Sequence, residues 1–407
     1  MSFYKEDVDE NSDEYDEYSE FSSVHYTTES TDNSTEYELS FNEGINYVLS
    51  EIRMPDQQVR LYTSHAQIIE DTIIRAMSRY DPYFKNAFKG LSLGGSYLDH
   101  LKICLPDEFD MHVKIYLGCH LEPVPVQGIP GYVFLRANNE YPHKCIKHFR
   151  NGWFVDRIAV QQWFRDIISA VMDEIQYIRI SRRYCYTMSY KKQGFGVAHN
   201  LVATDTKNSD RQISFDFVPV FEFEAKQFPR TMESVPNKGR TWFAVPRRFS
   251  AKWKDDSRSF IVCAPHWERI VLKNKQNLKD SLRLMKRFRD ANDMGALVSY
   301  KLKSLYLREL TKSRVNWDWP PGEILIKMLF NLLWSLYQKK LPFYLNTKHN
   351  LLNEISDRDR YRYISILRSH AGKLASRRKQ NYLTSDDMYN IFGIDDQSQC
   401  NSEYEDD

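Results

Sequence analysis

The 407-residue sequence has little of what stabilises small secreted domains or crosses membranes. Its six cysteines are scattered, and no Cys-x-x-Cys pair suggests a disulfide framework. No secretory leader with an apolar centre is recognisable, and no apolar run reaches about eighteen residues. We therefore expect a cytoplasmic protein without a membrane segment.

Zinc-binding spacing and internal repeats are missing as well. The closest group of potential ligands is His143, Cys145 and His148, and it has no second cluster to complete a zinc site. We expect these three to be ordinary loop residues and the protein to use no zinc. Tandem repeats and coiled-coil heptads do not occur, which excludes solenoids and long coiled coils.

The net charge is only +1, because two acidic ends offset a basic middle. Residues 1–44 carry fourteen acids and one Lys, and residues 395–407 carry six acids without Lys or Arg. Residues 45–394 are left with 55 basic and 35 acidic side chains. We expect a disordered acidic tail at 1–44, a second acidic tail at 395–407, and a core that binds a polyanion. The first tail either solubilises the chain or competes with that polyanion as a brake.

Two stretches place carboxylates on β-strands. In residues 107–115, apolar side chains alternate with polar ones, which predicts a half-buried strand. Glu108 and Asp110 then share one face of that strand. Asp216 lies in a second apolar run, 213–220, which could pair beside the first. Carboxylate oxygens favour Mg²⁺ or Mn²⁺, and two such ions could clamp the oxygens of a phosphoryl displacement.

A glycine turn precedes the acidic strand. Gly94 and Gly95 let the backbone approach a ligand closely, and the next residue, Ser96, adds a hydroxyl. Exposed N–H groups in such a turn can cradle a triphosphate. A phosphate-binding turn together with metal-binding carboxylates indicates a nucleotidyltransferase.

The remaining pattern predicts an α+β protein with two lobes. Apolar spacing predicts helices at 57–77 and 156–175, a loop at 121–132, and strands and hairpins over 176–225. Beyond about residue 245 the spacing is helical, at 266–290, 293–312, 322–340 and 356–374. We expect a mixed-sheet catalytic lobe with a spine helix over 45–245 and an all-helical lobe over 246–394, with the active site in the cleft between them.

The motifs then resemble a known family. Seven islands keep its order, including GGSYLDHLKICLPDEFDMHVKI, SFDFVPVFEFE, TWFAVPRR, FIVCAPHWER, SLRLMKR and LPFYLNTKHNLL. Over about residues 55–385 the chain resembles the cyclic GMP-AMP synthase (cGAS) and Mab-21 branch of the polymerase-β-like nucleotidyltransferases. The resemblance implies a bilobal enzyme that uses ATP, GTP and two Mg²⁺ or Mn²⁺ ions, senses nucleic acid, and signals in antiviral defence through a cyclic dinucleotide and its downstream receptor.

The resemblance also assigns roles to single residues. Glu108, Asp110 and Asp216 match the catalytic metal ligands, and Asp216 is the candidate that helps deprotonate the attacking ribose hydroxyl. The expected nucleotide contacts are Gly95, Ser96, Arg247, Glu268, Lys286, Ser299 and Tyr300, the last stacking on a base. For nucleic acid we expect contacts from Arg60, Arg75, Arg79, Arg248, Lys252, Lys254, Lys273, Lys275 and Lys279.

Two departures from vertebrate cGAS affect these expectations. Ile261, Cys263 and Pro265 replace an Arg and two Ser residues, which puts recognition of the acceptor base in doubt. The zinc insertion that helps grip DNA is missing, and the N-terminal tail is acidic. In both features the chain resembles insect receptors that respond to double-stranded RNA, so we expect RNA rather than DNA as the activator.

Two other functions stay open at this point. One is a catalytically silent Mab-21-like binding or developmental protein, although such relatives often lose acidic residues that this chain keeps. The other is a transferase with a linear product, such as a terminal nucleotidyl- or oligoadenylate-type enzyme. Phosphatase sensitivity of the product separates a linear oligomer from a cyclic dinucleotide.

Overall fold

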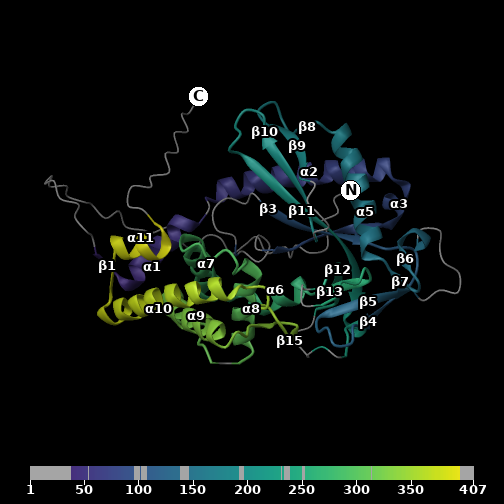
Figure 1. Cartoon of the computed structure of the whole chain (residues 1–407). Helices are drawn as coiled ribbons and strands as arrows, with labels where there is room; N and C mark the ends of the chain where they lie inside the picture. The colour runs from purple at the N-terminus through teal and green to yellow at the C-terminus, as the bar shows by residue number, and fades with distance from the viewer. Residues whose placement is uncertain are drawn as a thin grey trace.

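A computed structural model describes residues 38–53, 55–95, 101, 108–137, 146–191, 197–230, 232, 239–249, 253–312 and 314–394. Two lobes are evident, with a large sheet on the right of Figure 1 and a group of helices at the lower left. Most of the two predicted acidic tails, and the site residues Ser96 and Lys252, lie outside the described residues.

The first lobe is organised around a twelve-stranded mixed sheet. Its longest path runs β6-β7-β5-β13-β12-β11-β10-β9-β8, while β3 pairs with β11 and β2, and β4 pairs with β5. The strands are β2 (Phe88–Leu93), β3 (Glu108–Ile115), β4 (Leu121–Pro125), β5 (Tyr132–Ala137), β6 (Arg150–Asn151), β7 (Phe154–Val155), β8 (Tyr177–Arg179), β9 (Cys185–Lys191), β10 (His199–Asp205), β11 (Gln212–Glu224), β12 (Thr241–Pro246) and β13 (Ser259–Cys263).

Strand β11 holds the two halves of this sheet together. Its first half pairs with β10, its last four residues pair with β12, and the stretch from Ser214 to Val220 pairs in parallel with β3. The odd-numbered side chains from Ile213 to Phe223 are buried, as the alternating sequence predicts. The predicted strands over 107–115 and 213–220 are therefore confirmed.

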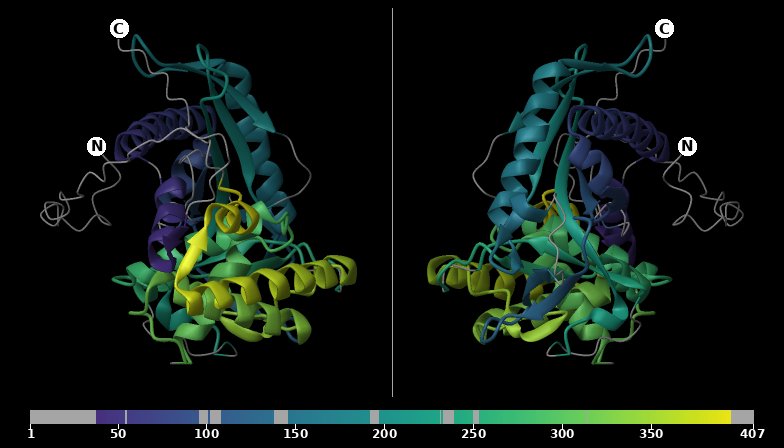
Figure 2. Two further views of the ribbon diagram at one scale, coloured as in Figure 1. Left: turned by 90° about the vertical axis from the view of Figure 1, so that its left-hand side faces the viewer. Right: turned by 90° about the vertical axis from the view of Figure 1, so that its right-hand side faces the viewer.

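Helices α2 (Asp56–Tyr80), α3 (Pro82–Ala87) and α5 (Arg157–Glu174) flank the upper strands, as Figures 1 and 2 show. The predicted helices at 57–77 and 156–175 are confirmed. Asp81 fixes the corner between α2 and α3: its carboxylate accepts from the Tyr83 N–H (2.6 Å) and from the Trp163 indole of α5 (2.7 Å). One short side chain thus joins all three helices.

The second lobe is mainly helical, and the yellow helix α10 runs across it in Figure 2. Its helices are α1 (Phe41–Ile52), α6 (Pro265–Leu272), α7 (Gln276–Ala291), α8 (Ser299–Leu310), α9 (Pro321–Tyr337), α10 (Asp357–Gln380) and α11 (Ser385–Phe392). Two small sheets complete it, β1 (Glu38–Ser40) with β16 (Tyr382–Thr384), and β14 (Pro342–Phe343) with β15 (Asn346–Asn350). No helix among the described residues is both long and apolar enough to span a bilayer.

The predicted disordered tail is too long at its C-terminal end, because residues 38–44 are ordered. Ser40 caps α1 through a hydrogen bond with the Glu43 N–H, and Phe41 is fully buried. Helix α1 lies so close to α9 that a Cβ on Gly322 would be 2.9 Å from side-chain atoms of Phe41 and Ile45. The acidic composition of residues 1–44 led to a prediction of disorder for the first residues of α1, an amphipathic helix of the second lobe.

Three further boundaries differ from the sequence prediction. The expected loop at 121–132 contains β4. Its prolines Pro123 and Pro125 are tolerated because β4 is an edge strand, which pairs with β5 alone among the described strands. The expected helix at 266–290 is two helices, because Asn274 takes a left-handed φ of 57° between α6 and α7. The sheet also continues past residue 245, since β13 pairs with β12.

The packing of α1 predicts that it supports the folded state. Phe41→Ala should lower the free energy of unfolding by about 3–5 kcal/mol, because it leaves a cavity between α1 and α9. Asn42→Ala is the matched control, since Asn42 is exposed on the same turn. Urea unfolding measures both variants. An equal, small effect of the two substitutions would show that residues 38–52 do not contribute to the core.

Candidate active site

The parallel pairing of β3 and β11 places the three predicted metal ligands on neighbouring strands. Asp110 is the register partner of Asp216, and Glu108 is the partner of Ser214. Paired residues on neighbouring strands point to the same face of a sheet, so the three carboxylates share one face. Asp110 and Asp216 are partly exposed and Glu108 is exposed, so the carboxylates stand at the edge of solvent.

The glycine turn is built against Asp110. The Gly94 N–H donates to the Asp110 carbonyl oxygen (2.8 Å), which ties the turn to β3. Gly95 has a φ of 68°, and a Cβ at this position would lie 1.6 Å from Asp110 Oδ2. Only glycine allows the turn to approach the carboxylate this closely. A phosphate held by this turn would therefore lie beside the acidic side chains.

Sequence reasoning missed Asn200 of β10. Asn200 is the register partner of Asp216, and its Nδ2 donates to Asp216 Oδ1 (2.9 Å) and to Ser214 Oγ (3.1 Å). The side chain thus fixes the orientation of the third carboxylate. Its only signal in the sequence is a polar residue at an alternating position of an apolar strand, and the partner depends on strand register.

The carboxylate oxygens of the three predicted ligands suit hard divalent cations. Within the part of the chain that the structure describes, no three His, Cys, Asp or Glu side chains are grouped closely enough to hold an ion. Asn200 already occupies one oxygen of Asp216, and carboxylates that approach one another without a cation repel. Glu108, Asp110 and Asp216 are the residues that would hold Mg²⁺ or Mn²⁺.

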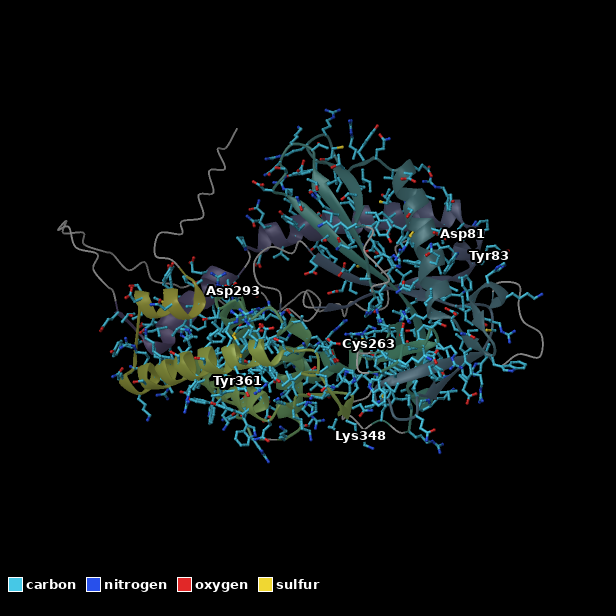
Figure 3. All side chains as sticks on the ribbon, viewed as in Figure 1. Asp81, Tyr83, Cys263, Asp293, Lys348 and Tyr361 are labelled. Carbon is cyan, nitrogen blue, oxygen red and sulfur yellow. The ribbon has the colours of Figure 1, made fainter. Side chains whose placement is uncertain are left out.

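A cleft of about 490 Å³ extends from Glu108 and Asp110 to the second lobe, and Asp216 is not among the described residues that line it. Glu108 and Asp110 line it from β3, Gly95 from the turn, and Lys286 and Ser299 from helices of the second lobe. Cys263, labelled near the middle of Figure 3, lies on its wall between the lobes. The volume is within the range of about 300–1,000 Å³ typical of small-molecule sites.

On the helical side, Glu268 is the centre of a buried network. Its carboxylate accepts from the Tyr300 hydroxyl (2.7 Å) and forms an ion pair with Lys303 Nζ (2.7 Å). Burial, and then the negative Glu268, raise the pKa of Tyr300 well above its ordinary value, so the hydroxyl remains a donor. The network joins α6 to α8 and fixes the orientation of the Tyr300 ring at the cleft wall.

Two cations on the helical side are also positioned by hydrogen bonds. Lys286 is buried, and its Nζ donates to the Leu101 carbonyl oxygen (2.8 Å), between the glycine turn and β3. Arg289 donates to Ser299 Oγ (3.0 Å) at the start of α8. Arg247 is exposed and lines the cleft just after β12. The described nucleotide-contact candidates therefore all line one cleft.

His112 is a cleft residue that the sequence did not single out. It follows Asp110 on the same face of β3. Burial, with a smaller effect from nearby His266, lowers the pKa of His112 to about 4. The imidazole is therefore neutral near pH 7 and adds no positive charge beside the carboxylates.

Comparison with known proteins decides the family. The Mab-21 protein nucleotidyltransferase domain matches residues 97–278, and the Mab-21 protein HhH/H2TH-like domain matches residues 277–369. A cyclic GMP-AMP synthase-like receptor of Drosophila eugracilis is 44% identical over 88% of this chain and 96% of its own length. A cyclic GMP-AMP synthase-like protein of Drosophila melanogaster is 34% identical over 77% of this chain and 87% of its own length. A cyclic GMP-AMP synthase-like receptor of Lucilia cuprina is 28% identical over 74% of this chain and 84% of its own length.

The chain belongs to the cGAS-like Mab-21 nucleotidyltransferase family. It is accordingly a nucleotidyltransferase, and the expected α+β fold with a helical second lobe is confirmed. The three residues that depart from vertebrate cGAS, Ile261, Cys263 and Pro265, all line the cleft of this family member. Burial raises the pKa of the Cys263 thiol to about 12, so the thiol is protonated near pH 7.

The basic residues expected to contact nucleic acid fall into three separate places. Arg60, Arg75 and Arg79 are exposed on α2, and Arg75 also lies 3.5 Å from the Asp71 carboxylate. Lys273, Lys275 and Lys279 lie at and after the junction of α6 and α7. Arg248 and Lys254 are exposed between β12 and β13. These residues lie on different elements of the fold, and their role stays a prediction.

Replacement of Gly95 tests the geometry of the turn. Gly95→Ala should lower kcat about a hundredfold or more, because the added Cβ must displace the Asp110 carboxylate. Gly152→Ala is the control, since Gly152 has a similar φ of 62° and no atom of the described residues lies within 4 Å of the place that its Cβ would take. Pyrophosphate release from nucleoside triphosphates measures activity. Equal activity of both variants would contradict the close approach.

Proposed function

We propose that this chain senses double-stranded RNA and joins ATP and GTP into a cyclic dinucleotide of the cyclic GMP-AMP type, as a receptor of innate antiviral immunity. The in-register pair of Asp110 and Asp216, beside the turn at Gly95, is the observation that carries the proposal. The printed names of the relatives, cyclic GMP-AMP synthase-like receptors, support the product class.

The reaction joins the nucleotides in two similar steps. In each, a ribose hydroxyl oxygen attacks an α-phosphorus, a new P–O bond forms, and the bond to the β-phosphate breaks to release pyrophosphate. Glu108, Asp110 and Asp216 would hold the divalent ions, which would neutralise the charge that develops during phosphoryl transfer. Asp216 is assigned to receive the proton of the attacking hydroxyl, with its orientation set by Asn200. The second step closes the ring.

The remaining cleft residues bind and orient the nucleotides. Gly95 and Lys286 face the triphosphate, and the ring of Tyr300 supports a base. Because Glu268 anchors the Tyr300 hydroxyl, the ring is held in place before substrate enters. The intact acidic residues favour this enzyme over a catalytically silent Mab-21-like protein. A linear-product transferase is distinguished by the product itself.

The basic middle of the chain supports a duplex partner. Residues 45–394 hold 55 basic and 35 acidic side chains, which suits a phosphate backbone. Double-stranded RNA is recognised through its backbone, its shape and its 2′-hydroxyls rather than its sequence. Among the candidate contacts, the exposed arginines of α2 and the lysines after α6 are separate from the carboxylates. Duplex binding at these places would leave the cleft open to nucleotides.

Product analysis tests the function directly. Purified full-length protein is incubated with ATP, GTP, Mg²⁺ or Mn²⁺ and RNA or DNA duplexes, and the products are separated by chromatography before and after phosphatase. We expect a phosphatase-resistant cyclic dinucleotide with RNA duplex and little with DNA. If about six to ten phosphates are contacted, RNA affinity should fall roughly 10³-fold or more between about 50 and 200 mM salt.

The other outcomes separate the alternatives. A phosphatase-sensitive product would identify a linear-product transferase, and stimulation by DNA but not by RNA would overturn the proposed ligand. No product with any duplex or metal would favour the silent binding protein. The variant with both Glu108→Gln and Asp110→Asn is the negative control, because it removes two proposed metal ligands.

A further inference from the structure

Helix α9 exposes a line of aromatic side chains on the second lobe. Phe330, Trp334 and Tyr337 are separated by four and three residues, so they lie along one side of the helix. All three are exposed, Trp334 at 65%. Single exposed aromatic residues are common on protein surfaces, whereas a contiguous apolar patch is typical of a contact surface. We call these three residues the aromatic stripe.

The aromatic stripe serves neither the core nor the catalytic cleft. The opposite side of α9, with Ile324, Met328 and Leu332, is buried and already joins the helix to the core of the lobe. No residue of α9 is among the described residues that line the cleft. A helix at the surface of a protein needs one apolar side for its core and is usually polar on the other. The aromatic stripe is therefore suited to a further contact.

The surroundings of the aromatic stripe are positively charged. Lys327 lies one turn before Phe330 on the same side of α9, and Lys340 follows the helix. Helix α10 packs beside α9, where Arg378 forms an ion pair with Glu323 (2.6 Å). The sequence of α10 holds eight basic and two acidic residues. An occupant with both aromatic and acidic side chains suits this surface.

Residues 1–37 have this composition and are attached at the right place. They lie outside the described residues, and their sequence carries twelve acids, one Lys and seven aromatic residues. The described chain begins at Glu38 in β1, which pairs with β16 directly after α10. Figure 1 shows β1 beside the end of α10. Phe41, just after β1, packs on Gly322 at the start of α9. Residues 1–37 are thus joined to the lobe where α9 begins and α10 ends.

We propose that residues 1–37 dock on the aromatic stripe of their own chain. Their Phe and Tyr rings pack on the stripe, and their carboxylates face the basic side chains of α9 and α10. Helix α9 is about 26 Å long, whereas 37 extended residues span roughly 120 Å, so the segment can follow the whole stripe. Attachment at one end gives an effective concentration of roughly millimolar order, which favours docking within one chain.

This contact is independent of the proposed function. It gives the acidic residues at the N-terminus a role other than the solubiliser or the brake that the sequence left open. Docking on α9 also keeps them away from the cleft, whose helical wall comes from α6, α7 and α8.

Photo-crosslinking of the full-length protein tests the docking. The photoreactive amino acid p-benzoylphenylalanine replaces Trp334, which keeps an aromatic side chain in the stripe, and crosslinked peptides are identified by mass spectrometry. We expect crosslinks from position 334 to residues 1–37. The same replacement of Trp153 is the matched control, because Trp153 is a similarly exposed Trp (63%) of the sheet lobe. It should give at least about tenfold fewer crosslinks to residues 1–37.

A second measurement uses ordinary substitutions. The double variant Phe330→Ser and Trp334→Ser removes two exposed rings, so the fold should be retained. Cleavage of residues 1–37 by a glutamate-specific protease should become about fivefold or more faster in this variant, because docking protects the segment in the wild type. Tyr177→Ser is the control, since Tyr177 is exposed on β8 of the other lobe. It should be cleaved at the wild-type rate.

The other outcomes overturn the proposal. Equal crosslinking to residues 1–37 from positions 334 and 153 would show that the segment has no preferred surface. A mixture of unlabelled and isotope-labelled chains identifies crosslinks between chains, and crosslinks of this kind alone would make the stripe an interface between two copies. Unchanged cleavage in the double variant would show that the stripe does not hold the segment. Neither measurement uses nucleotide or duplex, so each of these results leaves the proposed function intact.

Discussion

The parallel pairing of β3 with β11 is the constraint on which the site depends. It places Asp110 beside Asp216, and the same β11 reaches β10 on its other edge, where Asn200 holds Asp216. Carboxylates that share a face repel one another, so this register is costly unless cations are bound. The large buried core of the sheet lobe supplies the stability that maintains it.

The second lobe completes the site by contributing fixed cations and a rigid wall. Lys286 reaches across to the Leu101 carbonyl, and Glu268 orients Tyr300 at the wall of the cleft. These groups are held by hydrogen bonds within the protein, which reduces the ordering that nucleotide binding requires. The acidic strands and the helical lobe therefore make separate contributions: the first arranges the reacting centre, and the second positions the phosphates and bases.

Periodicity predicted the elements well where one face of an element is buried. The alternation around Glu108 and the spacing in α2 and α5 each determine a strand or helix locally. Contacts between residues that are distant in the sequence could not be predicted in this way, because periodicity is a local property. Asn200 acquires its role only through register, and the cleft forms only because α7 and α8 lie opposite β3 and β12. Helix α1 was hidden because its first residues fall in an acidic segment, whose composition outweighed the Ser40 cap.

Metal binding tests the central claim most directly, namely that Glu108, Asp110 and Asp216 act together as one cation site. Manganese bound to the full-length chain is counted by electron paramagnetic resonance in the presence of an α,β-methylene nucleotide. The account predicts two Mn²⁺ per chain, with binding weakened about tenfold or more by Asp216→Asn and unchanged by Asp210→Asn, a substitution in the exposed turn before β11. Equal stoichiometry and affinity in the wild type and both variants would contradict it.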